Sequence, residues 1–391
     1  MPETGPGPSG PHAATPAGRP RARSLGIPFG GTPGAWNAIT DVPGVEVGTV
    51  TLIRGESVRT GVTAIHPRGA ANPGDPVAAG FFSQNGNGEM TGVSWIRESG
   101  TFAGPVAITN THAVGIAHAA IVAWVARHHP RLAEAWLLPV VGETWDGYLN
   151  DINAPSVTER DCLEALRSAT AGPVEEGSVG GGTGMICYEF KGGNGTASRL
   201  VSFADTTYTV GVFVQANFGR RRELTLAGLP VGELLADYAG GSGGPGAQGA
   251  RSAPASAGSG AGSVIAIVGT DAPLLPQQCM ALARRVTLGI ARTGTTGSHF
   301  SGDLFLAFST GNPGAFTPGG EVMLGAVPER YDELRFVPWG FINPFYAAVV
   351  QATEEAVANA LVANEDMTGR DGHRTPALPR DRVAALLGAR G

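Results

Sequence analysis

Lysine is almost absent from this chain: of its 391 residues, only Lys191 is a lysine. A P-loop requires the pattern GxxxxGK[ST], and the surrounding residues EFKGG do not follow it. Schiff-base chemistry has this one candidate residue, and no serine has the spacing that a serine–lysine pair requires. The scarcity of lysine therefore excludes a P-loop nucleotide hydrolase and leaves lysine-based catalysis little room.

Cysteine is also scarce, and the three thiols lie far apart without a CxxC spacing. We expect Cys162, Cys187 and Cys279 to be reduced and buried, neither paired in disulfides nor bound to zinc. Histidine favours neither a metal site nor a histidine-based triad, because the adjacent pair 128–129 ends a predicted helix and the others lack ligand spacing. Among these others are His66, His112, His118 and His299. The sequence predicts no metal and no cofactor.

Positive charge is not in excess: the formal net charge is −6 and the isoelectric point is near 5.8. This balance argues against nucleic acid or an anionic membrane surface as the main partner. No apolar run reaches the length of about 18 residues that a membrane-spanning helix needs. The N-terminal residues MPETGPGPSGPHAATPAGRPRARS lack the apolar core of a signal peptide, which predicts a cytoplasmic protein with a disordered tail over residues 1–23.

Glycine, by contrast, is abundant, with 60 residues, and part of the excess lies in one segment. Between residues 239 and 262, 22 of 24 residues are Gly, Ala, Ser or Pro, the exceptions being Gln248 and Arg251. Such a segment cannot bury enough apolar area to offset its ordering entropy, so it predicts a flexible tether of the kind that is readily cut. It contains GGSGG (240–244) and GSGGPG (241–246), which match the nucleophile-elbow and dinucleotide patterns without the required strand and helix.

The segments on either side of the tether, 24–238 and 263–391, read as two parts of one catalytic domain. Hydrophobic residues make up 42% of the chain, which is enough for a sizeable core. The run VIAIV (264–268) is typical of a central strand covered on both faces. Helices are indicated over residues 111–130, 158–173, 276–294 and 343–365. Strands dominate both parts, which predicts sheets covered by helices on their outer faces.

Ser263 stands at the junction of the tether and this strand, directly after Gly262. If the peptide bond between them were cut, Ser263 would carry a free α-amine beside its own hydroxyl. An α-amine with a pKa of roughly 7.7–8.0 can act as a general base, and a hydroxyl activated in this way needs neither histidine nor lysine. A glycine before the cut leaves its carbonyl open to attack and tolerates strain. From the residues alone, a serine that merely begins a strand is the other interpretation.

Several long motifs resemble those of the D-aminopeptidase and β-peptidyl aminopeptidase family, and together they cover residues 23–367. These motifs are GIPFGGTPGAWNAITDVPGVEVG, GETWDGYLNDIN, EGSVGGGTGMICYEFKGGNGTASR, TDAPLLPQQCMALARR, SGDLFLAFST and VVQATEEAVANALVANEDMTG. The resemblance implies a serine N-terminal-nucleophile hydrolase of α+β class, a four-layer αββα sandwich self-cleaved into α and β chains. It also implies a homotetramer of αβ units that acts on small peptides, amides or esters, in some cases with D- or β-residues.

The resemblance also implies roles for individual residues. Ser263 is then the catalytic nucleophile, freed by cleavage after Gly262. Ser301 and Asp303, in SGD, match the pair that orients and tunes the amine and hydroxyl. Being two residues apart on a strand, they are expected to share a face, although a turn at the strand entry is the plainer interpretation. Asn217, in VQANFG, matches the asparagine whose amide donates to the oxyanion.

The loop GETWDG holds the two candidate substrate-binding residues, and it departs from some relatives at one of them. Trp145 stands where these relatives have tyrosine, and an indole N–H can donate but cannot accept or transfer a proton, so the second oxyanion contributor is open. Glu143 either pairs with the ammonium group of the substrate or caps the loop. The stretch GGGTG (180–184) either cradles a phosphate or permits close backbone approach near the cleft.

Together these features predict an autoprocessing serine aminopeptidase that removes N-terminal residues through an acyl-enzyme on Ser263. Two alternatives stay open at this point. One is an acyltransferase of related architecture, in which an amine rather than water resolves the acyl-enzyme. The other is a binding protein that keeps the fold but has lost processing.

Overall fold

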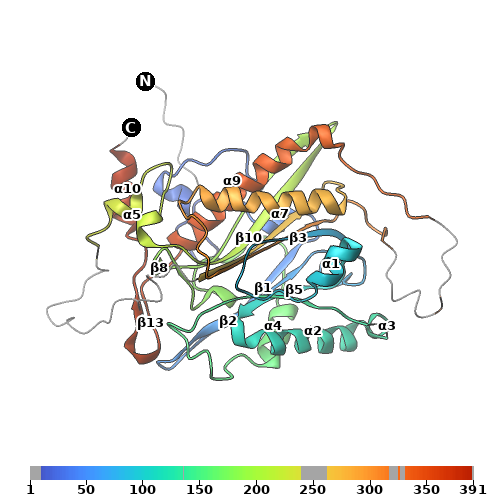
Figure 1. Cartoon of the computed structure of the whole chain (residues 1–391), viewed down its shortest axis with the longest axis horizontal. Helices are drawn as coiled ribbons and strands as arrows, with labels where there is room; N and C mark the ends of the chain where they lie inside the picture. Colours follow the sequence, from blue (N-terminus) through green and yellow to red (C-terminus); the bar gives the residue numbers. More distant parts are fainter. Residues whose placement is uncertain (1–9, 135, 239–261, 317–324, 326–330, 390–391) are drawn as a thin grey trace.

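Two main β-sheets form the body of the protein (Figure 1). The computed structural model describes residues 10–134, 136–238, 262–316, 325 and 331–389. The smaller sheet has the order β1–β2–β5–β6, and the larger has the order β4–β3–β12–β11–β10–β9. The smaller sheet contains β1 (Glu46–Arg54), β2 (Val58–His66), β5 (Val106–Asn110) and β6 (Val140–Thr144). The larger contains β3 (Val77–Gly86), β4 (Thr101–Phe102), β9 (Gly193–Phe203), β10 (Thr206–Asn217), β11 (Gly262–Thr270) and β12 (Ser301–Ser309).

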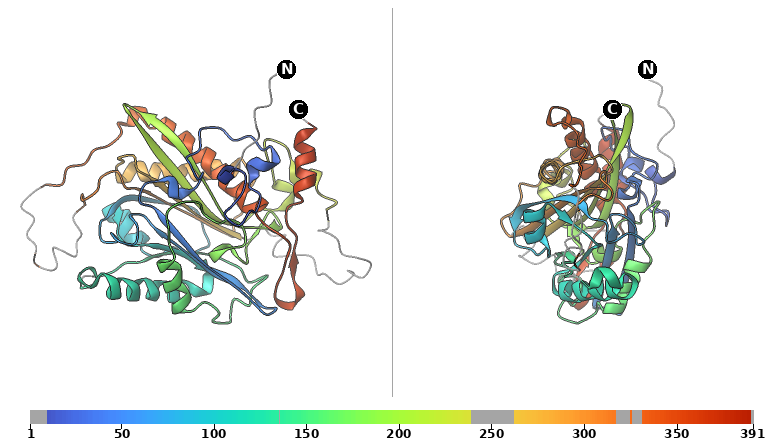
Figure 2. Two further views of the ribbon diagram at one scale, coloured as in Figure 1. Left: turned by 180° about the vertical axis from the view of Figure 1, so that it is seen from behind. Right: turned by 90° about the vertical axis from the view of Figure 1, so that its right-hand side faces the viewer.

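Helices cover the outer face of each sheet. Helices α7 (Pro276–Ala291) and α9 (Asn343–Val362) pack against the larger sheet, whereas α2 (Val114–His128) and α4 (Glu159–Arg167) pack against the smaller one (Figure 1). The side view in Figure 2 places these two helix pairs at opposite ends of the molecule. All four helices fall within ranges that the sequence predicts, and the expected mixture of helices and strands is confirmed.

The remaining elements are short. The other helices are α1 (Val93–Ser99), α3 (Pro130–Ala133), α5 (Val231–Leu234) and α10 (Arg380–Gly388). Two small hairpins pair β7 (Ile186–Cys187) with β8 (Phe190–Lys191) and β13 (Met367–Thr368) with β14 (Arg374–Thr375). Single 3₁₀ turns are η1 (Gly10–His12), η2 (Ala22–Leu25), η3 (Ile39–Asp41), η4 (Thr111–Ala113), η5 (Gly180–Gly182), η6 (Arg221–Glu223), η7 (Trp339–Phe341) and η8 (Arg370–Gly372).

Apolar side chains fill three separate clusters. The first lies between the sheets, where Phe213, Ile265 and Leu306 of the larger sheet meet Ile65 and Ile108 of the smaller one. The second fills the space between the larger sheet and α7 and α9, and the third the space between the smaller sheet and α2 and α4. Each fully buried aliphatic or aromatic side chain contributes roughly 1.5–3 kcal/mol. The sheets are therefore held rigidly against each other and against their helices.

Strand β11 occupies the middle of the larger sheet, as its apolar run predicts. It pairs antiparallel with β10 and parallel with β12. Its side chains alternate, so that Ile265 and Ile267 enter the cluster between the sheets while Val264 and Ala266 enter the cluster under the helices. Ser263 precedes this run by one step and therefore lies on the face of Ile265, toward the smaller sheet.

Residues 10–23 differ from the disordered tail expected over 1–23. Arg21 is only 3% exposed, and its guanidinium pairs with Glu176, with 2.7 Å between Nε and Oε2. Its Nη2 donates to the backbone carbonyls of Asn37 and Thr196. This ion pair fixes the segment to the body of the protein. Composition gave no sign of it, because the two partners lie 155 residues apart.

Other expectations concern residues that the structure does not describe. Residues 1–9 of the predicted tail and 239–261 of the predicted tether lie outside the described residues. Gly262, the last residue of the tether, is instead the first residue of β11. In the part of the chain that the structure describes, no helix combines the length and the apolar character needed to cross a membrane.

Candidate active site

A cavity of about 500 Å³ opens where β11 begins. Gly262, Ser263 and Asn217 line it from the ends of β11 and β10. Glu143 and Trp145 line it from the end of β6 and the loop that follows. Five of the predicted site residues, drawn from three distant parts of the sequence, therefore meet at one cavity.

The hydroxyl of Ser263 lies next to two groups that can donate hydrogen bonds. Its Oγ accepts a bond from the backbone N–H of Trp145 at 3.4 Å. Asn217 stands directly opposite Ser263 in the antiparallel β10–β11 register. The Asn217 Nδ2 donates to the Trp145 carbonyl at 2.9 Å, and its Oδ1 accepts from the N–H of Ile186 at 2.8 Å. An amide side chain and a backbone N–H are thus fixed beside Ser263, where negative charge on a substrate oxygen could be stabilised.

Ser301 and Asp303 lie at the start of β12, next to the same end of β11. In the parallel register Ser301 stands opposite Gly262, and Gly302 stands opposite Ser263. The Ser301 hydroxyl donates to the Asp303 carboxylate, with 2.5 Å between Oγ and Oδ1. This bond joins the two side chains on one face of the strand, as the sequence predicts. The alternative of a turn does not hold, because both residues belong to β12.

That shared face is not the face of the Ser263 hydroxyl. Ser301 and Asp303 line a separate small cavity of about 80 Å³, together with Val264 and with Thr287 of α7. The Ser263 side chain points the other way, into the larger cavity between the sheets. The pair therefore approaches the start of β11 from the helix side. Sequence spacing could not show this, because it depends on the register of two strands nearly 40 residues apart.

Asp303 is buried, and its carboxylate has a second partner that sequence reasoning missed. Asn85 faces it across the β3–β12 ladder, and Nδ2 of Asn85 donates to Oδ2 of Asp303 at 2.8 Å. Burial raises the pKa of Asp303, and hydrogen bonds from Ser301, Asn85 and the backbone of Val264 oppose that rise. The backbone N–H of Val264 donates to this carboxylate, and Val264 directly follows Ser263 in the chain. The carboxylate is therefore bonded to the backbone one residue after the nitrogen of Ser263. Asn85 has no local sequence signal, because only strand pairing makes it a neighbour.

Glu143 is a buried carboxylate on the cavity wall, 3% exposed. Its Oε1 accepts from the backbone N–H of Glu89 at 2.9 Å, and its Oε2 accepts from the hydroxyl of Thr111. Burial raises the pKa of Glu143, and these two hydrogen bonds oppose the rise. The carboxylate therefore both ties loops together and presents acceptor oxygens at the cavity. Thr111 and Glu89 were missed, because both come from other segments of the chain.

The indole of Trp145 is not the group that meets Ser263. Its side chain is half-exposed at 46%, and the contact is made by its backbone N–H. A backbone donor is present whatever side chain occupies the position. The departure from tyrosine therefore leaves this hydrogen bond to Ser263 unchanged, an outcome that reasoning from side chains alone had missed.

Glycines at two places are required by close backbone contacts. A Cβ on Gly262 would lie 2.4 Å from the Asn217 carbonyl oxygen and 2.9 Å from Cα of Phe218, so a side chain would push β10 away. In GGGTG, a Cβ on Gly181 would lie 2.6 Å from the backbone carbonyl oxygen of Ile108. Residues 180–182 are fully buried in η5. Their packing favours close backbone approach over a phosphate cradle.

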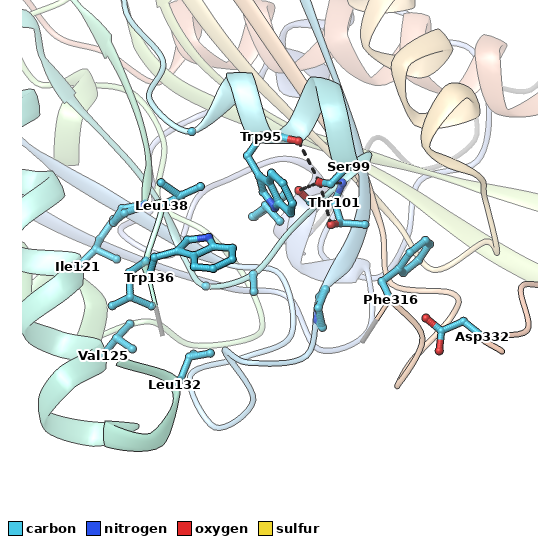
Figure 3. Close-up of a pocket in the computed structure, with 17 residues that line it drawn as sticks. Trp95, Ser99, Thr101, Ile121, Val125, Leu132, Trp136, Leu138, Phe316 and Asp332 are labelled. Atoms are coloured by element: carbon cyan, nitrogen blue, oxygen red, sulfur yellow. Dashed lines mark hydrogen bonds between the residues drawn. The ribbon is translucent and has the colours of Figure 1, made fainter. Parts of the chain in front are cut away.

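A second cavity, of about 420 Å³, contains none of the predicted site residues. Figure 3 shows Trp95 and Trp136 close together in its lining, with Phe316 and Asp332 at the far end. The two indole rings meet edge to face, with 6.5 Å between their centroids. We call this the tryptophan cavity.

The three cysteines are buried free thiols, as predicted. Burial raises the pKa of each thiol, to about 12 for Cys162 and Cys187. A thiol of this kind is a poor nucleophile at neutral pH. Over the described ranges, no group of three or more His, Cys, Asp or Glu side chains is arranged to hold a metal ion.

Comparison with known proteins identifies the family. The model of peptidase family S58 matches residues 37–375, which is most of the chain. The chain belongs to peptidase family S58. This S58 chain is 47% identical over 379 residues to the β-peptidyl aminopeptidase BapA of Sphingosinicella microcystinivorans, covering 94% of this chain and 92% of that protein. It is 45% identical over 380 residues to BapA of Sphingosinicella xenopeptidilytica, covering 95% and 92%.

Solved structures of S58-like enzymes share the fold. The L-aminopeptidase D-Ala-esterase/amidase of Ochrobactrum anthropi, described as a variant of the Ntn hydrolase fold, matches with a TM-score of 0.84 and 44% identity, over 95% of this chain and 99% of that one. A β-aminopeptidase from Burkholderia sp. matches with a TM-score of 0.83 and 44% identity over the same shares. The predicted family is confirmed, and the S58 chain is an aminopeptidase and a hydrolase.

Proposed function

We propose that this S58 aminopeptidase cleaves itself before Ser263 and uses Ser263 as both nucleophile and base. The observation that carries the proposal is the position of Ser263 at the start of a buried strand. Its hydroxyl faces a cavity beside Asn217 and the backbone N–H of Trp145. Among the residues that the structure describes, no histidine or lysine lines that cavity, so a base supplied by Ser263 itself fits the site.

Maturation then proceeds by an acyl shift. The Ser263 Oγ attacks the carbonyl carbon of Gly262, the C–N bond breaks, and the nitrogen leaves as the α-amine of Ser263. Water then hydrolyses the resulting ester and leaves a carboxylate on Gly262. The products are an α chain carrying the domain part 24–238, with the tether 239–262 either left on it or removed, and a β chain of residues 263–391. One layer of helices covers the larger sheet, the two sheets pack against each other, and a second layer of helices covers the smaller sheet. This succession of layers supports the interpretation that the two chains together form one four-layer αββα sandwich.

Turnover reuses the same groups. The Ser263 hydroxyl attacks the acyl carbon of an N-terminal residue, and the α-amine takes the hydroxyl proton. The amine passes this proton to the leaving amine, and water then hydrolyses the acyl-enzyme. Asn217 and the N–H of Trp145 donate to the oxyanion in both steps.

Ser301 and Asp303 hold the new α-amine from the helix side of the sheet. Ser301 stands beside Gly262 in the ladder, and Asp303 accepts from the backbone of Val264, so both flank the nitrogen of Ser263. The carboxylate of Asp303 can therefore orient the α-amine of Ser263 by accepting its hydrogen bond. The Ser263 hydroxyl stays free to face the cavity.

Glu143 binds the ammonium group of the substrate. It is a carboxylate on the wall of the cavity that Ser263 faces, which suits substrates with a free amine near the scissile bond. Small peptides, amino-acid amides and esters, including β-amino-acid derivatives, therefore form the substrate class. A homotetramer, which the family resemblance implies, and a cytoplasmic location, which the sequence predicts, complete the proposal.

Mass spectrometry of denatured protein tests the proposal directly. The wild type should give two chains that meet at Ser263, and N-terminal sequencing of the second should read Ser-Val-Ile-Ala. Ser263→Ala should remain one chain and should lose aminoacyl p-nitroanilide turnover by at least about 10³-fold.

Ser309→Ala serves as the matched control, because Ser309 is also a buried serine but lies at the far end of β12, bonded to the Ala272 carbonyl. It should be cleaved and active. An uncut Ser263→Ala protein that still turns over substrate would refute the proposal.

A further inference from the structure

The single lysine of the chain is buried behind the candidate active site. Lys191 lies in β8 and is fully buried. Its ammonium donates to the carbonyl oxygens of Met185 and Gly192, at 2.8 Å and 2.7 Å. Burial lowers its pKa to about 7, so holding a charge here is costly. None of the steps proposed above uses this cation.

One peptide unit connects the lysine to the oxyanion site. The Met185 carbonyl, which accepts from Lys191, and the N–H of Ile186 belong to the same peptide group. That N–H donates to Oδ1 of Asn217 at 2.8 Å. Nδ2 of Asn217 in turn donates one hydrogen to the Trp145 carbonyl at 2.9 Å. Its second hydrogen is left for the cavity, which Asn217 lines.

Hydrogen bonds in series polarise one another. A cation at the carbonyl oxygen of a peptide draws electron density away from its N–H and makes that N–H a stronger donor. The same shift then passes through the amide of Asn217 from Oδ1 to Nδ2. Lys191 and Asn217 are both buried, where low dielectric strengthens each of these effects.

Satisfying the carbonyl groups does not require the ammonium. The Met185 oxygen already accepts from the N–H of Gly192 at 2.9 Å. The Gly192 oxygen already accepts from Nδ2 of Asn364 at 3.1 Å. An apolar side chain at position 191 would therefore leave neither carbonyl without a donor and would avoid the cost of burying a charge. The hydrogen bonding of these two carbonyls therefore gives no reason for a lysine.

The geometry points to Lys191 as a positioning residue that polarises Asn217 through the Met185–Ile186 peptide and so strengthens the oxyanion donor. This inference rests on the proposed role of Asn217 and adds a residue behind it. Lys191 touches no substrate atom. Its effect should therefore appear in the rate of the chemical step and not in substrate binding.

A double-mutant cycle between Lys191 and Asn217 tests the inference. Lys191→Met, which keeps the length of the side chain without its donors, should lower kcat by roughly three- to eightfold and leave KM within about twofold. Asn217→Ala should lower kcat far more. In the Asn217→Ala background, Lys191→Met should have no further effect, because the group through which it acts is gone. The rate of self-cleavage should show the same pattern. The value of kcat is calculated from the concentration of processed chain, so that uncleaved protein does not affect it.

Asn364→Leu is the matched control. It removes hydrogen bonds to the Lys191, Gly192 and Ala360 carbonyls and from the Ser178 hydroxyl, but it leaves the ammonium in place. It should change kcat by less than twofold. Thermal unfolding checks that each variant folds, and Lys191→Gln, which keeps an uncharged donor, takes the place of Lys191→Met if the latter does not.

The possible results separate the two proposals. If Asn217→Ala leaves kcat unchanged, the proposed oxyanion role fails, and the inference fails with it. If Asn217→Ala lowers kcat but Lys191→Met costs the same in both backgrounds, the polarising role alone is overturned. If Asn364→Leu matches Lys191→Met, the lysine is structural.

Discussion

Two cavities of this protein, the Ser263 cavity and the tryptophan cavity, are similar in size and differ in chemistry. The Ser263 cavity has about 500 Å³ and the tryptophan cavity about 420 Å³. Each has a half-exposed tryptophan in its lining, 46% exposed for Trp145 and 49% for Trp136. The volume and the aromatic lining of a cavity therefore do not distinguish the candidate active site from the tryptophan cavity.

Buried polar groups make the difference. Glu143, with its raised pKa, and Asn217 meet in the first cavity, at the ends of strands that the core holds rigidly. In the tryptophan cavity the hydroxyls of Ser99, the last residue of α1, and Thr101, the first residue of β4, bond to each other at 3.1 Å, and both residues are only partly buried. A protein that buries a carboxylate and an amide beside a cavity accepts a cost, which is why such groups mark functional sites.

Substitution of Asn217 should give the largest loss of activity among the variants that test the difference between the two cavities. Asn217→Ala should lower kcat by roughly 10²–10³-fold, the usual cost of losing one oxyanion donor. Steady-state kinetics with an aminoacyl p-nitroanilide measures it. Asn312→Ala is the control, because Asn312 is also buried but bonds to Arg335 beyond the end of β12 that is opposite to Ser301. Equal losses in both variants would show that buried asparagines matter for stability alone.

The next effect concerns the ammonium of the substrate. Glu143→Gln should lower kcat/KM for substrates with a free amine by roughly 10- to 100-fold, because the ammonium would then meet an uncharged amide oxygen in place of a carboxylate. It should affect N-acetylated analogues far less, so the ratio between the two substrates is the measurement. An unchanged ratio would assign Glu143 to loop capping, the other role that the sequence allows.

Low pH should weaken the interaction between Glu143 and the ammonium of the substrate. Burial raises the pKa of Glu143, so the carboxylate takes up a proton at a higher pH than an exposed glutamate and loses its hold on the ammonium as pH falls through that value. The bond from Thr111 lowers this pKa, so Thr111→Val should move the acid limb of kcat/KM to higher pH. A limb that stays in place, or moves to lower pH, would contradict the assignment.

How much of this could be predicted from the sequence depends on whether the signal was local. The strand over 264–268 and helices α2, α7 and α9 were predictable, because their apolar periodicity lies within one segment. The shared face of Ser301 and Asp303 follows from a spacing of two. The family motifs located Asn217, Glu143 and Ser263, and the structure brings these three to one cavity.

What could not be predicted depends on contacts between distant segments. Asp303 faces away from the Ser263 hydroxyl because of the β11–β12 register, and Asn85 becomes its partner through the β3–β12 ladder. Arg21 orders residues near the N-terminus through Glu176, although composition predicts a disordered tail there. The bond from the backbone of Trp145 to Ser263 is also invisible to any reasoning from side-chain type.

The smallest expected effect compares the two half-exposed tryptophans. Trp145→Phe should change kcat by less than about threefold, because the N–H that meets Ser263 belongs to the backbone and survives the substitution. KM can shift, since the side chain lines the cavity. Trp136→Phe, at similar exposure in the tryptophan cavity, should change neither constant.

A loss of kcat above tenfold in Trp145→Phe alone would mean that the indole itself takes part in the reaction, so that the backbone N–H is not a sufficient donor. Losses in both variants would instead mean that the two cavities are coupled and that the tryptophan cavity is more than a surface hollow.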